Sequence, residues 1–291
     1  MQTMPRAISD LINARYSCRT YRAEPLTADE QTRLTEHLTA HTVGPFGSRA
    51  RFALAAAAAD DRAALKRLGT YGFIKGATGF LVGAVRRTAK DLEDYGYLVE
   101  QAILAATELG LGTCWLGGTF TRSRFAARLG GLERDETMPA VVSVGHPGDD
   151  GTERIRERQA GSRRLPASSL FFEERFGVPL ALAEGDSFAT VLEGVRVAPS
   201  ASNKQPWRIV RRGDDWHFYL ERTRGYGKGS PVFALLRLAD LQRVDLGIAM
   251  CHFELAAREL GLAGKWVLDE PDIGSLAQGV EYTATWQTTR A

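Results

Sequence analysis

The chain has 291 residues, of which 44% are hydrophobic and 25% are charged, and 37 Lys and Arg residues against 35 Asp and Glu residues leave a net charge of +2. This composition is typical of a soluble globular protein with a real core, and the near balance of charge provides no general field for nucleic acid or an anionic membrane. The N-terminus lacks the apolar run of a signal peptide, and the longest apolar stretch, 71–85, is too short to span a bilayer. We therefore expect a cytoplasmic protein whose partner is a small-molecule substrate, not nucleic acid or a membrane.

Apolar periodicity and turn signals predict a mixture of helices and strands. Helices are expected over 8–14 and from Thr27 to His41, where Thr27 and Glu30 form the pattern of a capping box. Strands are expected at 51–56, 80–85 and 139–145, and a hairpin joining 207–210 to 216–220 through the turn at Gly213. Because the two types do not alternate regularly, the predicted fold class is α+β.

The cysteines and histidines form no pattern of a disulfide framework or a metal site. Cys18, Cys114 and Cys251 lie far apart without a Cys-x-x-Cys pair, so we expect three unpaired thiols. His37 and His41 are one helical turn apart, but no third ligand lies near them in the sequence. We interpret this pair as part of a solvated helix end and predict no metal.

An internal repeat relates Asp94–Trp115 to Asp245–Trp266, with Asp, Gly, Leu-Ala-Ala, Glu, Leu-Gly-Leu and Trp positions in register. Each segment is typical of an apolar helix that ends at a glycine, Gly110 or Gly261, since glycine readily takes the left-handed conformation after a helix. Helices rich in Ala and Gly can approach a neighbour closely, so we expect these two inside an α+β domain or between domains. The repeat predicts two related halves, 1–160 and 161–291, joined by the polar, Arg-rich stretch around 148–166.

Three segments carry the chemistry of a ligand site. Arg15-Tyr16-Ser17-Cys18-Arg19 places two cations and a hydroxyl on one side of an extended chain, which suits a phosphate monoester, although a solvated basic turn is the plain alternative. The second segment, 198–207, combines small residues with Asn203 and Gln205, whose amides offer donors and acceptors to the polar edge of a planar ring. The third, 110–118, is read as a glycine-rich turn whose N–H groups can face a ligand.

Together these segments resemble the nitroreductase family of FMN-dependent flavoproteins. The family's Arg-x-Ser-x-Arg/Lys pattern is matched by Arg15, Ser17 and Arg19, and its Pro-Ser-x-x-Asn-x-Gln-Pro-Trp pattern by Pro199, Ser200, Asn203, Gln205, Pro206 and Trp207. Its Ala-rich helix and Gly-Leu-Gly turn are matched by the segment up to Gly118, and its basic residue before Leu-Pro by Arg164. The resemblance covers essentially the whole chain when both halves are counted.

The resemblance implies that NAD(P)H delivers a hydride to FMN and that a nitro-, quinone-like or other small oxidised substrate then takes the electrons in a ping-pong reaction. It implies that Arg15, Ser17 and Arg164 hold the phosphate, that Arg19 lies near N1 and O2, and that the N–H groups of Gly117 and Gly118 lie near N5 and O4, with no side chain as a dedicated acid or base. The residues expected to bind FMN are Arg15, Tyr16, Ser17, Arg19, Leu116, Gly117, Gly118, Arg164, Pro199, Ser200, Ala201, Asn203 and Gln205.

The chain departs from the family's pattern in its symmetry. Ordinary members are homodimers with a flavin in each interface groove, whereas here the Arg segment belongs to the first half and the Pro-Ser loop to the second. The mate groove would use 44–49 and 172–185, which lack both motifs. The sequence thus resembles the fused branch of the family, and we expect a monomeric pseudodimer with a nitroreductase-like fold duplicated in one chain and one FMN.

Three alternatives were weighed. A non-catalytic flavin-binding or redox-sensing protein is the nearest, because a degenerate second site shows that loss of function is tolerated. A nucleic-acid-binding protein that uses its Arg pairs is disfavoured by the near-neutral charge. A specialised flavin reaction, such as dehalogenation or flavin fragmentation, would need lid residues that the sequence does not identify.

Overall fold

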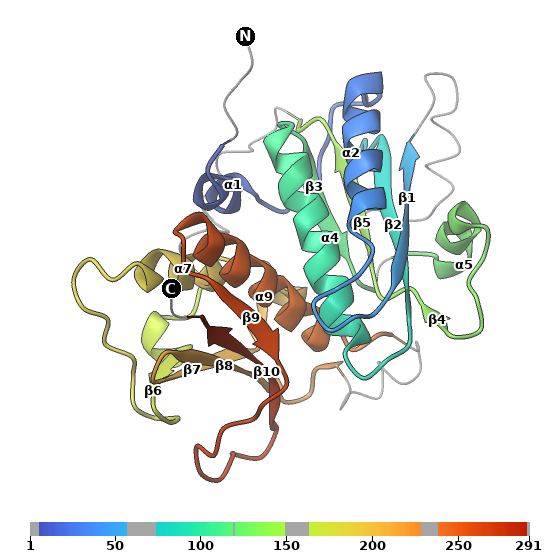
Figure 1. The fold of residues 1–291 in the computed structure, drawn as a ribbon. Coiled ribbons are helices and arrows are strands. Elements are labelled where there is room, and N and C mark those ends of the chain that lie inside the picture. The colour runs from blue at the N-terminus through green and yellow to red at the C-terminus, as the bar shows by residue number, and fades with distance from the viewer. Residues whose placement is uncertain (1–5, 57–73, 119, 149–162, 228–237, 290–291) are drawn as a thin grey trace.

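The computed structural model describes residues 6–56, 74–118, 120–148, 163–227 and 238–289. Figure 1 shows two β-sheets with two long helices, α4 (Asp91–Glu108) and α9 (Leu241–Glu259), side by side between them. The other elements of the first half are α1 (Ile8–Ala14), α2 (Ala28–Ala40), β1 (Ala50–Ala56), β2 (Gly79–Arg86), β3 (Gly112–Leu116), α5 (Arg122–Ala126), β4 (Glu136–Thr137) and β5 (Val141–Gly145). Those of the second half are β6 (Phe171–Glu173), α7 (Phe188–Arg196), β7 (Trp207–Arg212), β8 (Asp215–Glu221), β9 (Gly264–Val267) and β10 (Val280–Thr288). This arrangement is the α+β class that the sequence predicts.

The two sheets have the same strand order. The first runs β1-β2-β5-β3 and the second β7-β8-β10-β9, and every neighbouring pair in these two series is antiparallel. In the first half α4 follows β2 along the chain and precedes β3 and β5. In the second half α9 follows β8 and precedes β9 and β10. The sheets differ only in their additions, because β4 pairs with β2 in the first and β6 runs parallel to β7 in the second.

The local signals in the sequence predict the helix ends and the hairpin correctly. Thr27 and Glu30 form both hydrogen bonds of the capping box at the start of α2. Both long helices end in a Schellman motif, in which Gly110 and Gly261 have φ angles of +77° and +73°. The hairpin of β7 and β8 turns through Gly213 and the next residue, and pairs Arg212 with Asp215.

The residues after the two helices were expected to form turns, and this expectation is wrong. Gly112–Leu116 and Gly264–Val267 are strands, β3 and β9, that pair with β5 and β10. The residues Thr-Cys-Trp and Lys-Trp-Val favour extended backbone, and each strand finds a partner from a distant part of the chain. Gly117 and Gly118, directly after β3, form a bend in the chain.

The two halves share one hydrophobic core. A single cluster of buried residues includes Leu34 and Ile103 from the first half together with Trp207, Phe253 and Trp286 from the second. Polar contacts also cross the boundary. Glu259 at the end of α9 accepts hydrogen bonds from the backbone N–H groups of Ile8 and Ser9 at the start of α1.

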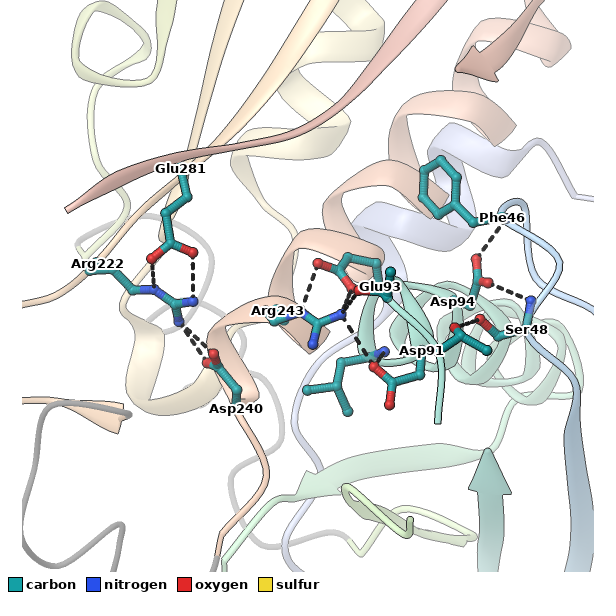
Figure 2. Close-up of polar contacts among 12 residues, drawn as sticks. Phe46, Ser48, Asp91, Glu93, Asp94, Arg222, Asp240, Arg243 and Glu281 are labelled. Atoms are coloured by element: carbon teal, nitrogen blue, oxygen red, sulfur yellow. Dashed lines mark hydrogen bonds and ion pairs between the residues drawn. The ribbon is translucent and has the colours of Figure 1, made fainter. Parts of the chain in front are cut away.

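At the other end of the helix pair, Arg243 of α9 binds Glu93 of α4 with 2.9 Å between Nε and Oε1 (Figure 2). The same guanidinium lies 3.2 Å from Asp91. The predicted boundary at residue 160 lies outside the described residues. The chain on either side of it belongs to one packed body.

Candidate functional site

The Arg segment lies beside strand β3 as an extended edge. Ser17 forms a parallel bridge with Thr113, and the N–H of Cys18 donates to the carbonyl of Thr113 at 2.8 Å. Tyr16 and Cys18 are buried in a small apolar cluster, Arg19 is exposed, and Ser17 is half-buried. The Arg15 side chain is also buried, with 6% exposed, so burial does not alternate strictly along this segment.

The Pro-Ser loop is built from unusual backbone conformations. Ser202, Asn203 and Gln205 all have positive φ angles, between 48° and 55°. Such angles are uncommon for residues other than glycine and cost about 1–3 kcal/mol where they are strained. The Gln205 N–H donates to the hydroxyl of Ser200 at 2.9 Å, which closes the loop on itself. A loop that holds three such residues is organised for more than connection.

The amides of this loop hold the segment 163–165. The Asn203 and Gln205 amide groups donate to the carbonyl of Arg163 at 3.0 and 3.1 Å, and Leu165 N–H donates to Gln205 Oε1 at 2.8 Å. Arg164 in turn donates to Asn203 Oδ1 at 2.9 Å and to the carbonyl oxygen of Val197 at 2.9 Å. The loop and Arg164 therefore form one hydrogen-bonded unit. The side-chain amides of Asn203 and Gln205, which the sequence suggested for the polar edge of a ligand, bind groups of the protein itself.

Equivalent aspartates support the loop that precedes the first long strand of each half. Asp94 accepts hydrogen bonds from Phe46 and Ser48 at 2.9 and 2.8 Å (Figure 2), and Asp245 accepts one from Ala201 at 2.9 Å. The second oxygen of Asp245, Oδ2, is buried and has no hydrogen-bond partner among the described residues. Burial raises the pKa of Asp245 well above its ordinary value. Asp245 thus has one buried carboxylate oxygen without a partner beside the Pro-Ser loop. Asp94, in contrast, uses both of its oxygens to bind the loop at 44–48.

Arg15 and Arg164 bring two buried guanidinium groups to one place. Only 6% of the Arg15 side chain is exposed, and its Nε lies 3.6 Å from the carboxylate of Glu100. Burial, then repulsion from Arg15 and Arg196, lowers the pKa of Arg164 to about 10. The Nε atoms of Arg15 and Arg164 are buried and donate to nothing in the part of the chain that the structure describes. Two close cations with an incomplete set of partners fit an anionic group.

Gly117 and Gly118 follow β3 directly and lie near the start of α9. A Cβ atom at Gly117 would overlap the side chain of Leu241, whereas one at Gly118 would come no closer than 3.6 Å to Leu238. The Leu241 side chain therefore occupies the space beside Gly117, where the two halves pack closely. Gly118 is exposed and has room beside it.

A cleft of about 460 Å³, here called the second cleft, lies beside the two long helices. Gly44 and Pro45 form one wall, as the sequence suggests, and the remaining walls come from α4, α9 and β9. The segment 172–185 was expected to line this groove, and that expectation is wrong, because its first residues belong to β6 and pair with β7 at the edge of the second sheet. In this cleft Glu254 accepts from Arg258 at 2.7 Å, so this arginine already has its own carboxylate.

The remaining polar candidates give no metal centre in the described ranges. No group of three or more His, Cys, Asp or Glu residues there is arranged to hold a metal ion. The rings of His37 and His41 stack with centroids 4.2 Å apart, and Cys18, Cys114 and Cys251 are free and buried. No described helix is long and apolar enough to cross a membrane.

Comparison with known proteins assigns the class to which this fold and site belong. Residues 7–257 match the family model described as "Putative TM nitroreductase", and the chain belongs to this family. A solved structure from Thermotoga maritima, described as a "putative nitroreductase", has 19% sequence identity and a TM-score of 0.60, and the match covers 99% of this chain and 96% of that one.

Other solved structures match about half of the chain. A protein from Desulfovibrio desulfuricans, described as a "putative nitroreductase in complex with FMN", is 22% identical with a TM-score of 0.41 over 57% of this chain and 96% of its own. A nitroreductase with bound FMN from Bacteroides fragilis is also 22% identical, with a TM-score of 0.37 over 50% and 90%. A search of curated protein sequences finds no match.

Proposed function

We propose that the chain is an FMN-dependent oxidoreductase that takes electrons from NAD(P)H and passes them to a nitro-, quinone-like or other small oxidised substrate. Membership of a nitroreductase family supports the general class. The flavin, when bound, supplies the hydride and electron transfer, and the protein supplies binding, orientation and electrostatics.

The observation that carries the proposal is the pair of buried cations at Arg15 and Arg164. Their Nε atoms lack hydrogen-bond partners within the described residues, and Glu100 is the one carboxylate that pairs with Arg15 there. Buried cations are costly unless an anion compensates them. Guanidinium groups bind phosphate through paired hydrogen bonds, so a phosphate monoester such as that of FMN completes the cluster. The chain has no Gly-x-Gly-x-x-Gly fingerprint for the pyrophosphate of FAD.

The other residues of this groove follow from their positions. Ser17 lies between the two arginines of the edge segment and adds a hydroxyl to the phosphate site, and Arg19 offers a cation to the ring. Leu116 ends β3, and the turn at Gly117 and Gly118 offers backbone N–H groups where the two halves meet. The Pro-Ser loop forms the wall from the second half. It includes Pro199, Ser200 and Ala201, and its Asn203 and Gln205 bind Arg164 and Leu165 respectively.

We further infer that the chain is a duplicated nitroreductase-like unit, 1–160 and 161–291, folded as a monomeric pseudodimer. The shared strand order, the equivalent Asp94 and Asp245 and the two Schellman ends support the duplication. Within the described residues, the groove with Arg15 and Arg164 brings two guanidinium groups together, and each has a buried Nε without a hydrogen-bond partner. In the second cleft, Arg258 is already paired with Glu254, so a phosphate would find less there.

Purified protein tests this proposal directly. We expect a yellow protein whose flavin, released by denaturation, is FMN, and we expect the holoprotein to oxidise NADH or NADPH with quinone or nitroaromatic acceptors. A protein that neither contains nor takes up FMN, or that releases FAD, would contradict the cofactor assignment. Tight FMN binding without NAD(P)H oxidation would instead establish a non-catalytic flavin-binding or redox-sensing protein.

A further inference from the structure

Glu100 is a fully buried carboxylate at the centre of the candidate site. It lies in α4, and its side chain has no exposed surface. Oε2 accepts from the indole N–H of Trp115 at 2.8 Å, and Oε1 lies 3.6 Å from Nε of Arg15. Burial alone would raise the pKa of Glu100, but the contacts with His252, Arg15 and Trp115 bring it below its ordinary value. The group is therefore a buried anion beside the guanidinium of Arg15.

The partner that fixes Glu100 comes from the other half. His252 lies in α9, fully buried, with Nε2 3.0 Å from Oε1 of Glu100 and Nδ1 2.9 Å from the carbonyl oxygen of Gly194 in α7. Both ring nitrogens lie within hydrogen-bond distance of an acceptor oxygen. The ring thus ties Glu100 to two helices of the second half, and the carboxylate has little freedom to turn.

We propose that Glu100, held by His252, is a positioning residue that presents the guanidinium of Arg15 to the phosphate of the flavin. This inference rests on the proposed function. Arg15 lies after the short helix α1 and has one carboxylate contact within the described residues. Without that contact, a long side chain has several rotamers to choose from, and binding the phosphate must then order it.

The second cleft provides a matched control. Glu254 is also buried, accepts from the indole of Trp266 at 2.7 Å, and is held by Tyr97 of the opposite half at 2.8 Å. Its arginine partner is Arg258. Within the described residues, Glu254 forms no hydrogen bond or ion pair with Arg15 or Arg164. Replacing Glu254 by Gln therefore disturbs a network of the same kind without touching the phosphate site.

The test compares FMN with riboflavin, which has the same ring and ribityl chain but no phosphate. Affinities for both are measured with apoprotein by quenching of flavin fluorescence, for the unchanged protein and the variants E100Q, E254Q, R15Q and R164Q. The quantity of interest is the ratio of the riboflavin Kd to the FMN Kd. We expect E100Q to lower this ratio by about five-fold or more, towards the value of R15Q, because an ordered charge-assisted contact is lost. E254Q should leave it unchanged.

The direction in which the Kd ratio changes in E100Q separates a positioning role of Glu100 from a purely electrostatic effect of its charge. Removing a carboxylate near the phosphate reduces repulsion, so charge alone would raise the ratio in E100Q. A general structural defect would weaken FMN and riboflavin alike. An unchanged or increased ratio in E100Q overturns the inference, whereas an unchanged ratio in both R15Q and R164Q would overturn the phosphate site itself.

Two further variants cover the case in which E100Q does not fold. E100D keeps the carboxylate and should restore part of the ratio. H252Q keeps the charge of Glu100 but removes its support, and should lower the ratio by less than R15Q does. Full discrimination in H252Q would show that the tie to α9 has no part in positioning Arg15.

Discussion

Gly96 and Gly247 occupy equivalent positions in the two long helices, and each faces the backbone of the other helix. A Cβ atom at Gly96 would overlap the carbonyl oxygen of Val244, and one at Gly247 would overlap that of Glu93. Val244 and Glu93 are themselves equivalent in the repeat, so the two close approaches are related by an approximate two-fold axis between the helices.

This pair leads to a prediction about stability. Changing Gly247 to Ala forces α4 and α9 apart, and we expect it to lower the free energy of unfolding by about 1–3 kcal/mol or more. Gly194 is the matched control, since its Cβ would meet only Ile12 at 3.5 Å and alanine is the better helix former. Urea unfolding of the two variants measures the difference. Equal stability of both would mean that the helices do not pack as closely as described.

Substitutions in the cation cluster should weaken cofactor binding. We expect R15A and R164A each to raise the FMN Kd about ten-fold or more, because a hydrogen bond to a charged group contributes about 1.5–3 kcal/mol. Arg19 is exposed and closer to the expected ring position, and R19A should show a loss that riboflavin shares. Titration of apoprotein with FMN and riboflavin measures both effects. Unchanged FMN affinity in all three variants would remove these residues from the site.

The number of flavins per chain tests the asymmetry of the two clefts. We expect one FMN per chain, bound in the groove that contains Arg15 and Arg164. Flavin absorbance together with amino-acid analysis gives the ratio. Separate fragments cut near residue 160 should bind none, since neither carries the whole groove and the core is shared between them. Two flavins per chain, or a flavin against 44–49, would contradict this reading.

His37 should make the protein sensitive to mild acid. Burial, and then the neighbouring His41, lowers the pKa of His37 to about 4. The folded state therefore binds this proton less readily than the unfolded chain, whose histidines titrate near 6.5. The contribution of neutral His37 is complete above about pH 6.5 and is lost as the pH falls towards 4.

The measurement is thermal unfolding at pH 7 and pH 5. The unchanged protein should lose more stability between these values than the variant H37Q does. His146, whose Nε2 lies 3.5 Å from Glu30 and whose side chain is 16% exposed, is a control histidine. An H146Q variant should keep the acid sensitivity, and an H37Q variant that keeps it as well would show that another group is responsible.

Much of the local structure follows from the sequence, because its causes are local. The capping box at Thr27, the glycine ends at Gly110 and Gly261 and the hairpin at Gly213 each depend on a few neighbouring residues. Strand β3 was missed because its glycines suggested a turn, and the partner that makes it a strand is far along the chain.

The support of the site was not predictable from local patterns. Glu100 and His252 lie in apolar helices that the repeat indicated only as helices, and their meeting depends on how α4 and α9 pack. One signal was available: a charged residue between Val99 and Ile103 in a helix with a buried face needs a partner. The sequence does not say which residue that partner is. Asn203 and Gln205 were similarly assigned to a ligand, whereas their amides hold Arg163 and Leu165.

The covalent connection of the two halves changes how such a groove responds to concentration. Arg15 and Arg164 meet inside one polypeptide, within a core that both halves build. A groove formed between separate subunits is lost by mass action when the protein is diluted. The two walls of the proposed groove belong to one chain and so stay at a fixed effective concentration at any dilution.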